Sequence, residues 1–398
     1  MSALRPRVIL ADALLAAAVA LFASLSATLA WAAVPPRPAA VPPRPATPTL
    51  SALGHVSLRA GAAFGTAVAG FGTTLVVGAP LLGGGVAYVY TREAGIWRET
   101  GELRGSGTRP GDFFGGSVAV RGSTIVVGAD SHGTTGRAYV FSRGSRGWHQ
   151  AAELAGAGGP RGSGFGYSVA IGAGTVVVGA PMPVVGSGAA YVFAATRGAW
   201  HQVAELRPRL PSFDSCFGFS VAAAGREALV GEPGDKDGAG RAFVFSSGPG
   251  GWRQTAELAG RDTQAGDNFG FSVAESAGRA LVGAPWHSGG AAYLFSASPG
   301  GWHETGEVSA GGTRAGDKFG WSVALGAALV LICAPGQGPG RAYLYPQGAS
   351  FRQGDELAGP SAPGSYFGAA SAVSGTAVVI GANGYRGGTG AALVTTAT

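Results

Sequence analysis

Short runs of apolar residues alternate with glycine-rich turns through most of the chain after residue 47. A representative stretch contains the runs Phe165–Ile171, Thr175–Pro181, Ala189–Phe193 and Trp200–Leu206. Each run is short and rich in β-branched and aromatic residues, which predicts strands separated by turns. The second run is a continuous apolar series instead of an alternation, and this pattern indicates a strand that is buried on both faces.

This four-strand unit is repeated along the chain. The dipeptide Phe-Gly marks each copy, at spacings of 48 to 52 residues: Phe64, Phe114, Phe165, Phe217, Phe269, Phe319 and Phe367. A period of this length with four strands per copy is typical of propeller blades. We therefore expect an all-β fold, a seven-bladed β-propeller of four-stranded antiparallel blades.

The last copy ends at Thr398 after its third strand and lacks a fourth. We expect an N-terminal strand from the segment Thr47 to Leu58 to complete this last blade, which would leave no exposed sheet edge. Leu53 lies eleven residues before Phe64, the same offset as Leu103 before Phe114. An alternative register places His55–Leu58 in the strand.

The N-terminus has the pattern of an export signal. Arg5 and Arg7 precede an apolar run from Ala13 to Leu25, and Ala30-Trp31-Ala32 offers a cleavage site between small residues. The alternative is an uncleaved signal anchor. A duplicated Val-Pro-Pro-Arg-Pro-Ala follows, which predicts an extended spacer or, alternatively, a PxxP ligand. The expected domains are a signal peptide (1–32), a Pro-rich linker (33–46) and the propeller (47–398), in a protein that is secreted or lies at the cell surface or in the periplasm.

Charge and cysteine content change this picture little. The net charge is +6, but only Lys236 and Lys318 are lysines and the arginines are scattered, so a nucleic-acid groove is not indicated. Cys216 and Cys333 fall in non-adjacent repeats, too far apart for a disulfide, and we expect two buried free thiols. We expect a monomer with no membrane contact beyond the export signal.

The repeat Phe-Gly-x-Ser-Val-Ala followed by Val-Val-Gly-Ala-Pro resembles the FG-GAP repeats of integrin α-subunits, and more closely the bacterial FG-GAP proteins with Gly-Ala-Ala-Tyr-Val-Phe and Trp before Glu-Leu. The resemblance covers residues 47 to 398 and implies an extracellular seven-bladed propeller with a recognition or adhesion role. Integrin-like repeats often carry an Asp-rich calcium loop, but the turns here, such as Arg121-Gly-Ser123, lack carboxylates. Calcium is therefore not carried over. The repeat also resembles kelch propellers, but this resemblance is weaker because Gly-Gly doublets do not recur at regular positions here.

Catalytic motifs are absent from the sequence: it has no Walker loop, no HExxH and no Gly-x-Ser-x-Gly. We expect no cofactor and no metal.

A glutamate recurs on the fourth strand of each full repeat, and we assign it to the scaffold or the solvated outer edge because the copies lie on different blades: Glu102, Glu153, Glu205, Glu257, Glu307 and Glu356. Asp112, Asp267 and Asp317, two residues before Phe-Gly, are expected to cap turns through their side chains.

Residues that are peculiar to one blade are free to carry function. Loops after the second strand and loops between blades emerge on one face, because strand direction alternates. The candidate ligand-binding residues on this face are Trp286, His287, Tyr385, Arg386, Ser131, His132, Asp235, Asp237, Arg109, Arg209, Phe213, Arg261 and Arg314. Exposed aromatic residues beside arginine favour recognition. Large rings after Phe-Gly, among them Tyr167 and Trp321, are expected to wedge between blades or, alternatively, to line the channel mouth.

These observations predict a binding or adhesion module that recognises an extracellular protein or glycan through one loop face. Two other hypotheses stay open. One is a glycan-active enzyme with its site at the channel mouth, and the other is a structural envelope protein, because propellers support many functions.

Overall fold

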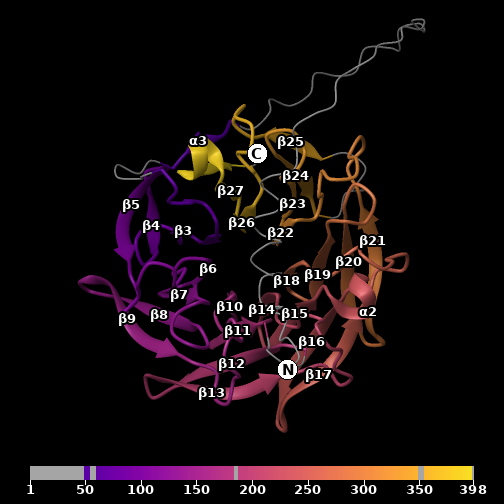
Figure 1. Ribbon diagram of the computed structural model, residues 1–398, viewed down its shortest axis with the longest axis horizontal. Coiled ribbons are helices and arrows are strands. Elements are labelled where there is room, and N and C mark those ends of the chain that lie inside the picture. The colour runs from indigo at the N-terminus through magenta and orange to yellow at the C-terminus, as the bar shows by residue number, and fades with distance from the viewer. Residues whose placement is uncertain (1–48, 54–59, 183–186, 348–353, 397–398) are drawn as a thin grey trace, which may run out of the picture. The chain divides into compact units, whose positions relative to one another are not determined.

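The computed structural model describes residues 49–53, 60–182, 187–347 and 354–396. The predicted leader, the Pro-rich linker and the alternative register at His55–Leu58 lie outside these residues. One compact unit spans Ala46–Thr398. In its described part, seven four-stranded antiparallel sheets form a ring, with the first strand of each sheet towards the centre and the fourth at the rim (Figure 1). The predicted seven-bladed propeller is confirmed.

The blades follow the order of the chain. Blade 1 contains β2 (Val68–Phe71), β3 (Thr74–Ala79), β4 (Val86–Glu93) and β5 (Ile96–Leu103). Blade 2 contains β6 (Ser117–Arg121), β7 (Thr124–Ala129), β8 (Arg137–Gly144) and β9 (Gly147–Leu154). Blade 3 contains β10 (Ser168–Ile171), β11 (Thr175–Ala180), β12 (Ala189–Thr196) and β13 (Ala199–Leu206). Blade 4 contains β14 (Ser220–Ala224), β15 (Glu227–Glu232), β16 (Arg241–Gly248) and β17 (Gly251–Leu258).

The remaining blades complete the ring. Blade 5 contains β18 (Ser272–Ser276), β19 (Arg279–Ala284), β20 (Ala291–Ser298) and β21 (Gly301–Val308). Blade 6 contains β22 (Ser322–Leu325), β23 (Leu329–Ala334), β24 (Arg341–Pro346) and β25 (Asp355–Ala358). Blade 7 contains β26 (Ala370–Ser374), β27 (Ala377–Ala382), β28 (Ala391–Thr396) and β1 (Ser51–Ala52). Two short helical turns, α2 (Asp235–Gly238) and α3 (Tyr385–Gly388), lie between second and third strands.

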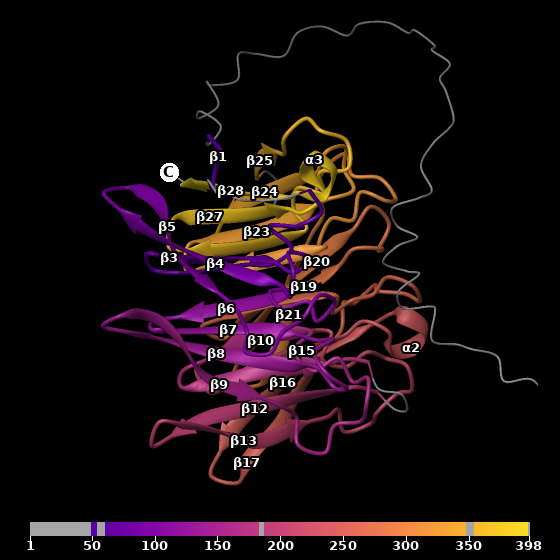
Figure 2. The same ribbon diagram turned by 60° about the vertical axis from the view of Figure 1, so that its left-hand side comes forward.

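The ring closes where β1 pairs antiparallel with β28, the two segments lying side by side in Figure 2. Ser51 lies opposite Val394, and the backbone N–H of Leu53 donates to the carbonyl of Ala392 at 2.9 Å. Leu53 is buried in the core. The N–H of Phe64 also donates to the carbonyl of Thr389, so blade 1 is joined to blade 7 by the same kind of bond that joins the other neighbours.

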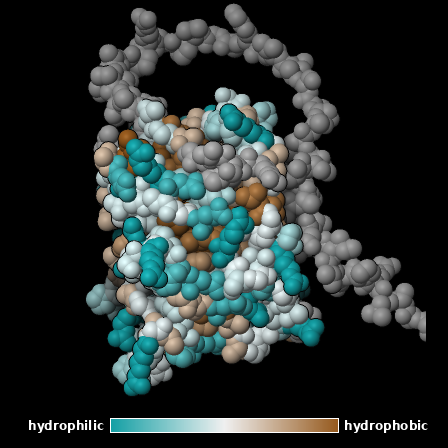
Figure 3. All heavy atoms as spheres, turned by 90° about the vertical axis from the view of Figure 1, so that its left-hand side faces the viewer, coloured by the Kyte–Doolittle hydropathy of each residue, from teal (hydrophilic) through white to brown (hydrophobic). Residues whose placement is uncertain are grey.

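Burial follows strand position within each blade. The second strands are buried along almost their whole length, for example all six residues of β3, because each is covered by the blades on both sides. The fourth strands alternate between exposed and half-buried residues, for example β13. Figure 3 shows the result on the side where β5 and β9 lie, a surface of mainly hydrophilic and neutral side chains with scattered apolar spots. No helix in the described part of the chain is long and apolar enough to cross a membrane.

The Phe-Gly dipeptide joins neighbouring blades. Each of its seven phenylalanines is fully buried. A serine stands two residues after the glycine of Phe-Gly in five blades. Its hydroxyl donates to the backbone carbonyl of the Phe-Gly glycine in the next blade, for example from Ser117 to Gly166 at 2.7 Å. Glycine in the Gly-Ala-Pro strand allows this close approach. A Cβ on Gly128 would lie 1.9 Å from the carbonyl oxygen of Gly166.

The two cysteines are free, as predicted. Cys333 is buried, and burial raises the pKa of its thiol to about 11. Cys216 is only half-buried, which differs from the expectation, because it precedes a Phe-Gly dipeptide in a loop and not in a strand.

Candidate functional site

The loops between second and third strands and the loops between blades emerge on one face of the ring, which we call the loop face. Each second strand ends at Gly-Ala-Pro or a variant of it. The fourth residue after this glycine position lies in the loop to the third strand, and it differs between most blades. In the described residues this position holds Leu82, His132, Asp235, His287, Gln337 and Tyr385. Four of the predicted candidates therefore share one structural position, and the blades differ from one another most clearly there.

The predicted aspartate caps are confirmed. Asp112, Asp267 and Asp317 each accept a hydrogen bond from the backbone N–H three residues earlier, at 2.6 to 2.8 Å. Two of them also hold a histidine across the loop. Asp112 Oδ2 lies 2.7 Å from His132 Nδ1, and Asp267 Oδ2 lies 2.8 Å from His287 Nδ1. The same carboxylate thus orders an inter-blade loop and fixes an imidazole ring.

The rings that follow Phe-Gly form a continuous aromatic arc across blades 3 to 6. Tyr167 contacts Phe219 with ring centroids 5.0 Å apart, Phe219 contacts Phe271 at 4.8 Å, and Phe271 contacts Trp321 at 4.5 Å. All four residues are half-buried. The rings do contact one another across blade boundaries, as the wedge interpretation expects. They also follow one another just before the first strands, at the ends of those strands that lie towards the loop face.

Trp286 extends this arc outward. Its ring lies 5.1 Å from Phe271 and 5.7 Å from Trp321, and 41% of the residue is exposed. The ammonium group of Lys318 stands over both indoles, 4.6 Å from the Trp321 centroid and 5.4 Å from the Trp286 centroid. A cation over ring faces in this range is attracted by their negative quadrupole. We call these six residues the aromatic site: Tyr167, Phe219, Phe271, Trp286, Lys318 and Trp321.

A half-buried carboxylate lies at the Tyr167 end of the aromatic site. Asp130 stands where five other repeats have a proline, and burial raises its pKa to about 6. Its negative charge adds to burial in raising the pKa of Tyr167 above its ordinary value, and the thiol of Cys216 acts in the same direction. These three groups come from three successive blades and are near enough to influence one another's ionisation.

Several predicted residues lie elsewhere on the loop face. Asp235 is buried, with its carboxylate held by the hydroxyl of Ser212 and by Arg241 at 2.8 Å, so it stabilises the loop from inside. Asp237 is exposed on α2. The guanidinium of Arg209 donates to the backbone carbonyl of Gln254.

The other predicted residues are more accessible. Arg314 is exposed, and its backbone N–H donates to Asp317. On α3 the exposed Arg386 stands over the half-buried ring of Tyr385, with its guanidinium 5.2 Å from the ring centroid. His132 and Arg109 line a surface cavity of ≈ 760 Å³ between blades 1 and 2, together with Asp112 and Glu153.

The repeated glutamates pair with arginines, in agreement with their assignment to the outer scaffold. Arg137, Arg241 and Arg341, each the first residue of a third strand, pair with the glutamates of blades 2, 4 and 6. Arg104 and Arg207 do the same for blades 1 and 3. Glu307 differs, because its partner Arg261 stands 3.6 Å away, in the loop that precedes blade 5.

Sequence reasoning missed three side chains on this face. Lys318 was noted only for its charge, Glu307 was grouped with the scaffold, and Asp262 was not singled out. Each was detectable as a departure from the repeat: Lys318 precedes Phe-Gly where no other repeat has a lysine, and Asp262 replaces the glycine of other inter-blade loops, such as Gly107 and Gly312.

Comparison with protein families matches the FG-GAP repeat at residues 97–141, 148–193, 200–245, 252–295 and 302–345, together more than half of the chain. Each match starts at a fourth-strand tryptophan and runs into the third strand of the next blade, so it spans the Phe-Gly junction between two blades. A search of the curated proteins found no match.

Proposed function

Because the chain belongs to the FG-GAP repeat family, whose propeller fold suits a binding or adhesion-type domain, we propose that it is an exported binding module that holds a protein or glycan partner through its loop face. The aromatic site is the proposed centre of contact. The basis for export is the N-terminal pattern of a basic start, an apolar run and a small-residue cleavage site.

The single observation that supports this proposal is the aromatic arc itself. Rings from four different blades are aligned in contact, in addition to the fully buried Phe-Gly phenylalanine at each blade junction. Half-buried rings on a rigid scaffold offer contact area at little cost in conformational entropy, and tryptophan is the residue most enriched in binding hot spots.

The arc also has the polar neighbours that recognition needs. Lys318 supplies a positive charge at the Trp286 end, and Asp130 supplies a titratable carboxyl at the Tyr167 end. Tyr385 and Arg386 add an aromatic and cationic pair in blade 7. The arrangement favours a partner that presents apolar or ring surface flanked by groups able to accept hydrogen bonds.

Glycan arrays and pull-down from extracellular material, each with and without chelator, test the proposal. The chain with Trp286→Ala and Tyr385→Ala should lose at least tenfold in affinity for the partner found, with an unchanged melting temperature. Ile96→Ala removes an exposed apolar side chain (57% exposed) from the opposite face and should bind like the parent chain. Binding that survives the double change, or turnover of a glycan substrate in place of retention, would contradict the proposal.

A further inference from the structure

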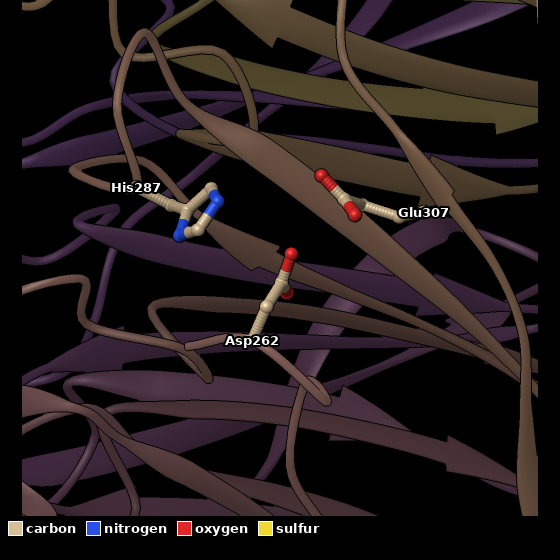
Figure 4. Close-up of side chains that lie close together, drawn as sticks. All are labelled: Asp262, His287 and Glu307. Atoms are coloured by element: carbon tan, nitrogen blue, oxygen red, sulfur yellow. The ribbon is translucent and has the colours of Figure 1, made fainter. Parts of the chain in front are cut away.

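Three side chains with metal-ligating atoms meet beside Trp286 on the loop face. Asp262 comes from the loop between β17 and β18, His287 from the loop between β19 and β20, and Glu307 from β21. One ligand atom from each lies within 4.8 Å of the others. Figure 4 shows the two carboxylates and the imidazole ring pointing into the same space.

The imidazole of His287 is oriented for metal binding. Its Nδ1 lies 2.8 Å from Asp267 Oδ2, and the carboxylate accepts the Nδ1–H. In the neutral imidazole, this bond makes Nε2 the nitrogen with a free lone pair and therefore the available ligand atom. A carboxylate that holds the second ring nitrogen is the usual outer partner of a metal-ligating histidine, since it fixes the tautomer and the ring orientation and raises the basicity of the ligand. The side chains of His287 and Asp267 are only 19% and 12% exposed.

Asp262 is also positioned by an outer hydrogen bond. The hydroxyl of Tyr293 donates to Asp262 Oδ1 at 2.8 Å, which leaves Oδ2 for another partner. The Tyr293 hydroxyl therefore holds this carboxylate in place from outside the three-ligand set.

The charges around the three ligands favour a cation. Asp262, Glu307, Asp267 and Glu304 bring four carboxylates, against one guanidinium from Arg261. Arg261 stands 3.6 Å from both Glu304 and Glu307 and its side chain is 69% exposed, so it can turn into solvent when a cation binds.

We propose that Asp262, His287 and Glu307 bind one Zn²⁺ ion. The set supplies one imidazole nitrogen and two carboxylate oxygens, and a water molecule would take the fourth position of a tetrahedral site. The imidazole and the small number of oxygen ligands do not suit Ca²⁺ or Mg²⁺, which take six or more ligands, mostly oxygen. Tetrahedral ligands at the usual Zn–N and Zn–O lengths stand about 3.3 Å apart. The three ligand atoms lie within 4.8 Å of one another, so side-chain movements of about 1.5 Å would bring them to this spacing.

The chain contains its own comparison for this site. In blade 2 the aspartate–histidine pair recurs as Asp112 and His132, beside Glu153, but glycine (Gly107) stands in place of the third ligand. In blade 6 the corresponding residues are Gly312, Gln337 and Glu356, and the Gln337 amide oxygen accepts a hydrogen bond from Tyr343. Of the three blades preceded by a loop with a capping aspartate, only blade 5 has all three ligands among the described residues.

Zinc would connect two loops and a strand. His287 is adjacent to Trp286 in sequence, so a bound ion would hold the loop that carries the outermost ring of the aromatic site. The metal proposal does not require a partner for that site, because metal binding is measured on the isolated chain.

Equilibrium dialysis of the untagged full chain against ZnCl₂, after removal of metal with EDTA, tests the site. We expect one equivalent of zinc per chain. His287→Ala, Asp262→Asn and Glu307→Gln should each weaken this binding at least tenfold, and Asp267→Asn by about 10- to 100-fold through loss of the outer hydrogen bond.

His132→Ala is the matched control and should keep the full equivalent, because its site lacks the third ligand. Glu307→Gln and Asp262→Asn preserve side-chain size, and circular dichroism with thermal unfolding verifies that each variant is folded. Zinc binding that is absent from the parent chain, or that is the same in the folded Asp262→Asn, His287→Ala and Glu307→Gln variants, would overturn the proposal.

Discussion

Cys333 occupies the position that glycine holds in the six other blades, and its Cβ faces Gly368 of the next blade, where an added Cβ would lie 2.8 Å from it. In the other blades a Cβ at this position would lie 1.9 to 2.0 Å from the carbonyl oxygen of the next blade's Phe-Gly glycine. At Cys333 the neighbouring chain has shifted away. A Cβ placed on Gly368 is 3.1 Å from the Arg341 carbonyl, compared with 2.2 to 2.5 Å for the equivalent contacts elsewhere.

The junction between blades 6 and 7 accordingly differs from the others around Gly368. At each of the six other junctions, the Phe-Gly phenylalanine forms a parallel β-bridge with the glycine before the third strand of the preceding blade, as Phe114 does with Gly85. Among the described residues, no such bridge joins Phe367 to Gly340. The N–H of Phe367 still donates to the carbonyl of Pro339 at 3.2 Å.

Gly283→Ala should therefore destabilise the fold strongly, whereas Cys333→Gly should not. The Cβ added at position 283 would meet the Gly320 carbonyl at 2.0 Å, a contact with backbone that cannot rotate away, and we expect a loss of about 3 kcal/mol in the free energy of unfolding. Cys333→Gly allows the backbones at this junction to approach as closely as at the others. The loss of unfolding free energy that usually follows a large-to-small core substitution should therefore be absent. Urea unfolding of both variants measures this. Equal losses would show that glycine is not required by the close approach.

The serine hydroxyls between blades should each stabilise the ring modestly. Ser220→Ala removes a 2.8 Å bond to the Gly270 carbonyl and should lower the free energy of unfolding by about 1 kcal/mol. Blades 1 and 7 have Ala67 and Ala370 at this position. Ala67→Ser should restore the bond to Gly115 and stabilise the chain by a similar amount. A destabilising Ala67→Ser would indicate that these two junctions are packed differently.

The repeat explains why the fold could be predicted from the sequence. Phe114 and Phe165 stand 51 residues apart in equivalent sequence contexts, and both are buried at blade junctions. The repeat period therefore predicted the number of blades. The eleven residues between Leu53 and Phe64, the same spacing as from Leu103 to Phe114, indicated the N-terminal strand. The capping role of Asp267 followed from its local spacing in the same way.

The aromatic and metal-ligating sites were harder to predict, because they depend on contacts between repeats. Glu307 looked like the other fourth-strand glutamates, and only its neighbours Asp262 and His287, which come from two different loops, distinguish it. Trp286 was a candidate from its position, but its contact with Trp321 depends on the direction of two side chains from adjacent blades. Local spacing contains no information about such directions.

Glu275 should make the stability of the chain depend on pH. Its two carboxylate oxygens are shielded from solvent, and the Glu227 carboxyl of the preceding blade is near enough to act on its ionisation. Burial first, and then the Glu227 charge, raise its pKa to about 8. Other blades have apolar residues here, such as Val120 and Leu325.

The folded chain therefore holds a proton on Glu275 that the unfolded chain releases above its ordinary pKa of 4.5. Stability is lost as pH rises from about 4.5 to about 8, because unfolding releases this proton. Glu275→Gln removes the titration and should stabilise the chain by about 4 kcal/mol at pH 8, with no gain near pH 4. Thermal unfolding of both chains across this range is the measurement. A constant difference between them at all pH values would refute the interpretation.

A second zinc site should arise in blade 2 from one substitution. Gly107 occupies the position of Asp262, and a Cβ built on it lies 4.0 Å from the His132 ring, with Glu153 lining the same cavity. Gly107→Asp would complete an aspartate, histidine and glutamate set, with Asp112 already holding His132 Nδ1. The φ of Gly107 is +76°, which costs a non-glycine residue about 1 kcal/mol, and aspartate is among the residues that tolerate it best.

The number of zinc ions bound per chain in equilibrium dialysis should then rise from one to two, and His132→Ala in the same chain should return it to one. Gly107→Asn imposes the same backbone strain with a much weaker ligand, so it should stay at one. Because the new ligand completes a histidine and glutamate that are already in place, failure of Gly107→Asp to bind the second ion in a folded chain would mean that these two side chains, and by analogy His287 and Glu307, are not directed at a common point.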